Sequence, residues 1–216
     1  MSYGVRVETW GEYALFSRPE LKTERMSYEV ITPSAARGLI ESIYWHPGLN
    51  VVIDKIYVLN KIQFTNIRRN EVKSKASLAQ VKSMMNGGSA PMIISSNDIM
   101  QRASTILRDV HYVIDSHFEL TDKAAPGDNE GKFKDIFRRR IEKGMAYSQP
   151  YFGCREFPAY FRPWVGDAVP TSGETKDLGL MLYDMDYSDP QNIRPMFFMA
   201  KLENGVMQVA GEKVLE

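Results

Sequence analysis

Three side chains of this sequence, Tyr44, His46 and Lys132, have the chemistry needed to move protons and to stabilise a negatively charged phosphate. Tyr44 and His46 stand at the end of one predicted helix, and Lys132 stands at the start of another. Cleaving RNA without a metal ion requires a proton acceptor for the 2′-hydroxyl, a cation for the phosphorane and a proton donor for the leaving 5′-oxygen. Lysine suits the cation, and tyrosine or histidine suits the proton transfers. The alternatives are that Tyr44 is a core or interface aromatic residue and that His46 only interacts with a helix dipole.

The sequence lacks the motifs of several other enzyme classes. G-x-x-x-x-G-K-[ST], H-E-x-x-H and G-x-S-x-G do not occur. The single cysteine, Cys154, has no Cys or His neighbour at metal-ligand spacing, so we expect neither a metal site nor a cofactor. His111 and His117 share one face of a predicted strand with Asp115 between them. The two histidines could bind a metal ion together, but histidines that only form hydrogen bonds within a sheet are more common.

Basic side chains gather in two segments, although the whole chain has 27 basic and 27 acidic residues. Segment 61–82 has six Lys or Arg residues against one Glu, and segment 129–143 has six against three acidic residues. Segment 164–216 is acidic, with nine acidic residues against four basic ones. Two basic runs in a neutral chain favour a phosphate backbone as partner over merely solvated faces. The residues expected to contact phosphates are Arg68, Arg69, Lys73, Lys134, Arg138, Arg139 and Arg140.

Two predicted helices position these residues. Thr32-Pro33 is typical of a helix start, and Pro47-Gly48 stops the same helix. Its apolar stripe is Ala36, Leu39, Ile40 and Ile43. The second helix follows Asp128 or Asn129 as its cap and ends before Gly144 in a left-handed conformation. Its apolar stripe is Phe133, Ile136, Phe137 and Ile141.

Alternating or β-branched segments predict the strands. They lie near 5–10, 51–59, 103–107, 110–120 and 151–161, with a loop at 11–24 and a long, partly mobile insertion at about 61–98. This β-α-β-insertion-β-α-β order is that of the ferredoxin-like fold, which also builds RNA-recognition modules. We therefore predict an α+β protein with a ferredoxin-like (RRM-like) domain at 1–163. A small antiparallel β domain follows at 164–216, with strands near 178–183, 196–202 and 206–209.

Six short strings occur in order along the chain: WGEYALF at 10–16, ESIYW at 41–45, VHY at 110–112, HF at 117–118, NEGK at 129–132 and GCREF at 153–157. On these strings the chain resembles the CRISPR-associated Cas-five family of subtype I-C, and the acidic C-terminal quarter matches only loosely. The resemblance implies a ferredoxin-like RAMP protein that cuts precursor CRISPR RNA in its repeat hairpin. It also implies a metal-free attack by the 2′-hydroxyl, which leaves a 2′,3′-cyclic phosphate and a 5′-hydroxyl.

The resemblance places the family's catalytic tyrosine on Tyr44 and its lysine on Lys132. The family's histidine falls on Phe133, which cannot transfer a proton. Either His46 or another group substitutes, the histidine is dispensable, or this chain cuts slowly. A scaffold that binds the RNA handle without cutting is the alternative function.

The expected partners are CRISPR repeat RNA or crRNA and the other subunits of a subtype I-C surveillance complex (Cascade). Double-stranded DNA remains open as a further partner. We expect no membrane association, because no run of about 18 apolar residues occurs. The single cysteine fits a reducing compartment, so the expected location is the prokaryotic cytoplasm.

Overall fold

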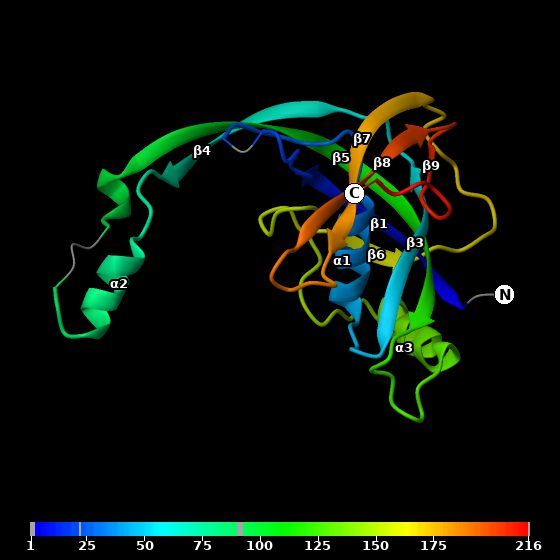
Figure 1. Cartoon of the computed structure of the whole chain (residues 1–216). Helices are drawn as coiled ribbons and strands as arrows, with labels where there is room; N and C mark the ends of the chain where they lie inside the picture. The colour runs from blue at the N-terminus through cyan, green and yellow to red at the C-terminus, as the bar shows by residue number, and fades with distance from the viewer. Residues whose placement is uncertain (1–2, 22, 90–92, 216) are drawn as a thin grey trace.

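A large, mostly antiparallel sheet forms the centre of the molecule (Figure 1), which a computed structural model describes for residues 3–21, 23–89 and 93–215. Few helices accompany the sheet, and the protein is of the mixed α/β class. The strands follow the order β6–β1–β5–β3–β9, and β2 and β4 pair with β5. Their bounds are β1 Gly4–Ala14, β2 Arg25–Met26, β3 Leu49–Val58, β4 Phe64–Val72, β5 Ile99–Leu120, β6 Tyr160–Pro163 and β9 Val206–Gln208. A separate two-stranded sheet consists of β7 (Lys176–Asp186) and β8 (Arg194–Leu202).

The two predicted helices are confirmed as α1 (Pro33–Ile43) and α3 (Glu130–Glu142). The Thr32 side chain caps α1 by accepting from the Ala35 amide at 3.3 Å, and Asn129 caps α3 by accepting from the Lys132 amide at 2.9 Å. Gly144 follows α3 with a φ of 62°, as a left-handed helix end requires. The predicted apolar stripes are buried, except that Ile136 is only partly buried. Both helices share one hydrophobic core with inward-facing side chains of β1, β3 and β5.

The two strands predicted at 103–107 and 110–120 are one continuous strand, β5. Its first half pairs with β4, and its second half pairs with β1 and β3. Asp109 has a φ of 52° and lies next to the point at which β5 changes partners. The sequence pattern marked this local irregularity correctly. The strand nevertheless continues through it, because β5 has hydrogen-bonded neighbouring strands both before and after Asp109.

The predicted strand at 151–161 is wrong. Residues 151–158 form a tight turn closed by an isolated bridge between Tyr151 and Pro158, and β6 begins only at Tyr160. Gly153 has a φ of 77° there, and a Cβ on it would lie 2.0 Å from the Leu15 carbonyl oxygen. The predicted loop at 11–24 is also partly wrong, since β1 continues to Ala14.

The predicted insertion contains regular structure. β4 and the first half of β5 form a curved ribbon that projects away from the rest of the molecule (Figure 1). Helix α2 (Leu78–Met85) lies at its tip and has no buried residue, and a short 3-10 helix (Ser95–Asn97) leads back into β5. We call residues 64–107 the arm. Residues 90–92 of the expected insertion lie outside the described residues.

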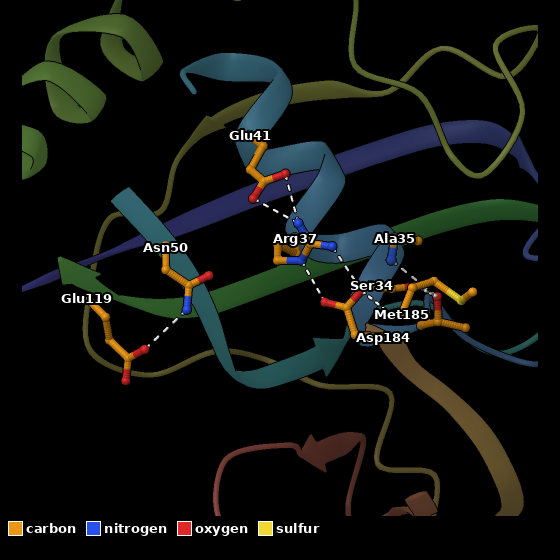
Figure 2. A network of polar contacts seen from close by, with 9 residues as sticks. Ser34, Ala35, Arg37, Glu41, Asn50, Glu119, Asp184 and Met185 are labelled. Atoms are coloured by element: carbon orange, nitrogen blue, oxygen red, sulfur yellow. Dashed lines mark hydrogen bonds and ion pairs between the residues drawn. The ribbon is translucent and has the colours of Figure 1, made fainter. Parts of the chain in front are cut away.

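The C-terminal strands predicted at 178–183 and 196–202 are confirmed as β7 and β8, but β9 pairs with β3 in the large sheet. Arg37 of α1 holds the small sheet through two hydrogen bonds to Asp184 of β7, at 2.7 and 2.8 Å (Figure 2). The same guanidinium donates to Glu41 at 2.9 Å, and the Asp184 hydrogen bonds raise the pKa of Arg37. In the part of the chain that the structure describes, no helix is long and apolar enough to cross a membrane.

Candidate active site

Tyr44 lies where α1 ends and packs directly against α3. It is the C-cap residue of α1 and has extended backbone angles, so the chain leaves the helix at this residue. Its ring makes an edge contact with Phe137, at 5.5 Å between centroids, and a tilted contact with Phe133, at 6.3 Å. The end of α1 and the first turns of α3 therefore meet around this tyrosine, as the sequence predicted.

Lys132 is in the first turn of α3 and is held by a carboxylate. Its Nζ donates to Asp128 Oδ1 at 2.7 Å, and the Ala125 amide donates to Asp128 Oδ2 at 2.9 Å. The Asp128 side chain is only 2% exposed, whereas that of Lys132 is 50% exposed. The hydrogen bond between them raises the pKa of Lys132 and lowers the pKa of Asp128, so both groups are charged at neutral pH.

His46 joins the same cluster. Its ring lies parallel to that of Tyr44, 6.4 Å away between centroids, and its Nδ1 is 3.9 Å from Asp128 Oδ2. The Gly48 amide donates to His46 Nδ1 at 3.1 Å. Nδ1 is then the unprotonated nitrogen of the neutral ring, and the proton is on Nε2. His46 can therefore donate a hydrogen bond from Nε2.

Phe133, the residue on which the resemblance places the family's histidine, is fully buried. Its ring lies 5.2 Å from the His46 ring and 6.3 Å from the Tyr44 ring, measured between centroids. It is part of the apolar stripe of α3 and of the hydrophobic core. Phe133 thus packs against the rings of Tyr44 and His46 from the core and offers no group for proton transfer.

Arg140 also turns toward this cluster rather than toward solvent. Its Nη1 donates to the Ile43 carbonyl oxygen at 3.2 Å, and its guanidinium lies 5.4 Å from the centre of the Tyr44 ring. The Ile43 carbonyl belongs to the last turn of α1, which leaves carbonyl groups without partners inside the helix. Arg140 therefore stabilises the end of α1 and the position of Tyr44.

The other predicted phosphate contacts divide between two surfaces. Lys134, Arg138 and Arg139 are exposed on α3, and Arg68 and Lys73 are exposed on the arm. Arg138 pairs with Asp135 at 3.1 Å, and Lys134 lies over the Tyr3 ring. Arg69 faces the opposite side of β4 from Arg68, and its guanidinium is bound to Glu156 and Ser104. Arg69 thereby ties the arm to the turn at 151–158.

Sequence reasoning missed the roles of Asp128 and Arg140 in this cluster. Asp128 was considered only as a helix cap and Arg140 only as a phosphate contact. The signal for Asp128 was its spacing, since it lies four residues before Lys132 at a helix start. The signal for Arg140 was its place beside Ile141 at the edge of the buried stripe. His111 and His117 do share one sheet face, and each contacts a carboxylate on a different neighbouring strand, Glu8 and Asp54 respectively, at 2.8 Å.

Comparison with known proteins identifies the family over nearly the whole chain. A family model described as CRISPR-associated protein (Cas_Cas5), of the Cas5d type, matches residues 4–210. A curated protein of Mannheimia succiniciproducens, named CRISPR pre-crRNA endoribonuclease Cas5d, is 44% identical over 217 residues, which cover 97% of this chain and 96% of that protein. A protein of the same name from Thermus thermophilus is 38% identical over 229 residues, which cover 98% and 93% of the two chains.

Solved structures share the fold at lower sequence identity. One described as a CRISPR-associated protein has a TM-score of 0.70 at 21% identity and covers 100% of this chain and 97% of its own. A functionally uncharacterized protein of Streptococcus mutans has a TM-score of 0.68 at 22% identity, with coverage of 100% and 98%. A chain of a CRISPR RNA-guided surveillance complex has a TM-score of 0.52 at 11% identity, with coverage of 98% and 89%. The family model and the two curated relatives show that this chain belongs to the Cas5d family of CRISPR-associated proteins.

Proposed function

We propose that this chain is an endoribonuclease that cuts precursor CRISPR RNA within its repeat hairpin. The reaction is attack by the RNA's own 2′-hydroxyl without a metal ion, and it leaves a 2′,3′-cyclic phosphate and a 5′-hydroxyl. The names of the two curated relatives support the activity. The observation that carries the proposal for this chain is the cluster where α1 meets α3: the rings of Tyr44 and His46 lie parallel, and Asp128 lies beside both His46 and Lys132.

The cluster supplies the groups that the reaction needs. The 2′-oxygen forms a bond to phosphorus, the bond from phosphorus to the 5′-oxygen breaks, and one proton leaves the 2′-hydroxyl while another joins the 5′-oxygen. The Lys132 ammonium, held charged by Asp128, stabilises the negative phosphorane. Tyr44 and His46 are the two groups beside it that transfer protons. The Nε2–H of His46 can donate a hydrogen bond to the leaving oxygen while Nδ1 accepts from the Gly48 amide. Transfer of the proton itself requires the imidazolium form, in which the Gly48 contact is given up.

We further propose that the sheet is of the ferredoxin-like type and that the cleaved RNA stays bound. The strand order β6–β1–β5–β3, with α1 and α3 connecting the strands, supports the ferredoxin-like assignment. The division into domains at 1–163 and 164–216 stays a prediction. In this proposal the protein keeps the 5′ handle as a subunit of a subtype I-C surveillance complex in the prokaryotic cytoplasm. The exposed cations of α3 and the arm hold phosphates of the repeat.

The second candidate function is a scaffold that holds the RNA handle without cutting it. The observation that favours it is Phe133, a buried phenyl ring at the position of the family's histidine. Phe133→His addresses this alternative directly. Faster cutting by that variant would show that the missing imidazole limits the parent enzyme.

Cleavage assays with the repeat RNA of the accompanying CRISPR array separate the two functions. We expect the pure protein to cut this RNA in EDTA, and we expect a single 2′-deoxy substitution at the cut site to abolish cutting while binding persists. Intact RNA bound to the parent protein would support the scaffold. The role of His46 is tested with a 5′-phosphorothiolate at the cut site, whose sulfur leaves without protonation. This substrate should restore the rate of His46→Ala but not that of Lys132→Ala.

A further inference from the structure

A pocket opens on the sheet face opposite α1 and α3. Val7 of β1 points into the helix-covered core, so its neighbours in the alternating strand, Glu8 and Trp10, point to the other face. Together with residues of β5, β6 and the segment after β3, they line a pocket of about 560 Å³. This volume lies within the range of small-ligand sites. The candidate active site lies on the helix side, so the pocket is separate from it.

A buried charge forms the floor of this pocket. The Glu8 side chain is 4% exposed and accepts from Arg162 Nε at 2.6 Å and from Arg162 Nη2 at 2.7 Å. His111 Nε2 lies 2.8 Å from the same carboxylate. The Arg162 hydrogen bond lowers the pKa of Glu8, so the carboxylate stays charged. Because both partners of Glu8 approach it from neighbouring strands, their side chains are fixed before any ligand arrives.

Arg162 can still bind an anion through the part of its guanidinium that does not contact Glu8. Its side chain is 61% exposed, and its Nη1 makes no hydrogen bond to any residue that the structure describes. Guanidinium groups bind phosphate oxygens well, and this guanidinium is already oriented by Glu8. The pocket therefore presents one directed cation at its rim.

Trp10 supplies a flat aromatic surface beside this cation. It is half-buried and stacks on Tyr160, 6.0 Å away with an interplanar angle of 25°. The Arg162 guanidinium lies 5.2 Å from its ring, and His111 meets it edge-on at 6.2 Å. Tyr160 is 57% exposed and extends the aromatic surface. Such surfaces bind single-stranded nucleic acid by stacking on its bases.

Hydrogen-bond acceptors complete the lining. Glu12 is exposed at the rim, and the Asn60 side chain is fixed by donating its amide to the Asp109 carbonyl oxygen at 3.0 Å, which leaves its own oxygen available. Carboxylate and amide oxygens accept from the exocyclic amino groups of adenine, cytosine and guanine. Uracil has no such group. Two strings that marked the family in the sequence, at 10–16 and 110–112, contribute to this pocket and take no part in the proposed cleavage site.

We propose that this pocket binds one unpaired nucleotide of the RNA, with an amino-bearing base on Trp10 and a phosphate on Arg162. The inference rests on the proposed function in that it concerns the RNA that the protein retains. It adds a site of base discrimination on the sheet face away from the cleavage chemistry.

Binding measurements with altered RNAs test the proposal on the unmodified protein. The probes are cognate repeat RNAs, made uncleavable by a 2′-deoxy cut site, with an abasic site or a uridine placed at each unpaired nucleotide in turn. At one position the abasic substitution should weaken binding about five- to a hundredfold, and uridine there should bind more weakly than the amino-bearing base. Equal affinity at every unpaired position would overturn the proposal.

Variants then connect that position to the pocket. Trp10→Ala should weaken binding of the normal RNA and should make the abasic substitution nearly silent, while Trp10→Phe retains part of the effect. Tyr187→Ala, an aromatic residue that is 60% exposed in the turn before β8, is the matched control and should bind like the parent. Full sensitivity to the abasic site in a folded Trp10→Ala protein would overturn the assignment. So would loss of subunit association with unchanged RNA binding, since the pocket would then bind protein.

The cleavage assay keeps this test independent of the proposed activity. If the parent protein binds but does not cut the RNA, and the Trp10-dependent base preference remains, the cleavage proposal fails and the pocket stands. If the protein cuts but no unpaired base matters, the pocket assignment fails alone.

Discussion

At the scale of single residues, the carboxylate of Asp128 raises the pKa of Lys132 by accepting its hydrogen bond. Asp128→Asn replaces the carboxylate by a neutral amide and removes the negative charge that favours the ammonium form, so the pKa of Lys132 should fall toward the ordinary value of about 10.4. The lysine would then lose its proton at a lower pH than in the parent. We expect the alkaline limb of the single-turnover pH–rate profile to shift to lower pH. An unmoved alkaline limb, together with a uniform loss of rate, would indicate that Asp128 acts only on structure.

Lys132 and Tyr44 themselves should affect the chemical step rather than RNA binding. Lys132→Ala removes the cation for the phosphorane, which typically costs on the order of 2.7–4 kcal/mol, or about a hundred- to thousandfold in rate. Tyr44→Phe keeps the ring that packs on Phe137 and removes only the hydroxyl, so we expect slow cleavage with normal affinity. Single-turnover rates at saturating RNA measure both effects. Parent rates in both variants would place the active site elsewhere.

The sequence predicted that the end of α1 would approach the start of α3, because helix ends are well marked and both helices were expected on one sheet face. The contributions of Asp128 and Arg140 were not predictable in the same way. The first depends on the path of the loop before α3, which buries a carboxylate. The second depends on the distance between α1 and α3, which decides whether an arginine at the edge of an apolar stripe reaches a carbonyl oxygen or solvent.

At the scale of elements, α3 presents cations of two kinds. Arg138 and Arg139 are exposed, and Arg140 is held against the end of α1. Neutralising Arg138 and Arg139 together with Gln should weaken RNA binding for all sequences and reduce the slope of log affinity against log salt by about one to two. Arg140→Gln should instead lower the cleavage rate, because it releases Tyr44. An unchanged salt slope in the double variant would mean that this face is only solvated.

The arm should determine which RNA shape is preferred. It carries Arg68 and Lys73 on a ribbon that projects from the sheet, far along β5 from its pairing with β3 (Figure 1). Replacing residues 73–98 by a short turn keeps the pairing of β4 with β5 and removes the tip. We expect the shortened protein to lose its preference for repeat hairpins over unstructured RNA of equal length. Competition binding with the two RNAs measures this, and a preserved preference would show that the tip does not contact the stem.

Elements with a clear periodicity, such as α1, α3 and β3, were predicted correctly. Those set by long-range pairing were not. The length of β5 depends on β4 and β1, which lie far away in sequence, and the turn at 151–158 depends on the close approach of Gly153 to Leu15. Regular structure in the arm was missed because β4 has no fully buried residue and carries polar side chains on both its exposed and its half-buried face, so it lacks a hydrophobic pattern.

At the scale of the whole molecule, the acidic C-terminal segment is docked on the helix that carries Tyr44. Arg37 joins α1 to β7 by a bidentate pair with Asp184, and Asn50 of β3 donates to Glu119 of β5 nearby (Figure 2). The pairing of β9 with β3 adds a second connection between the C-terminal segment and the large sheet. The predicted boundary at 163/164 therefore separates segments that are in close contact in the folded protein.

Breaking the Arg37–Asp184 pair should loosen this docking without changing the chemistry at Tyr44. Asp184→Ala leaves a guanidinium that is 25% exposed and that has Glu41 as its one carboxylate partner among the described residues. Losing hydrogen bonds to a charged group costs about 1.5–3 kcal/mol. We expect the midpoint of thermal unfolding to fall by several degrees and the segment between β6 and β7 to be cleaved faster by protease. Glu203→Ala, which removes an exposed carboxylate directly after β8, is the matched control and should change neither quantity. The cleavage rate per folded molecule should stay within about twofold of the parent, because Phe133, Phe137 and Arg140 still hold Tyr44 in place. A large loss of cleavage rate well below the unfolding temperature would mean that the small sheet itself positions α1 for catalysis.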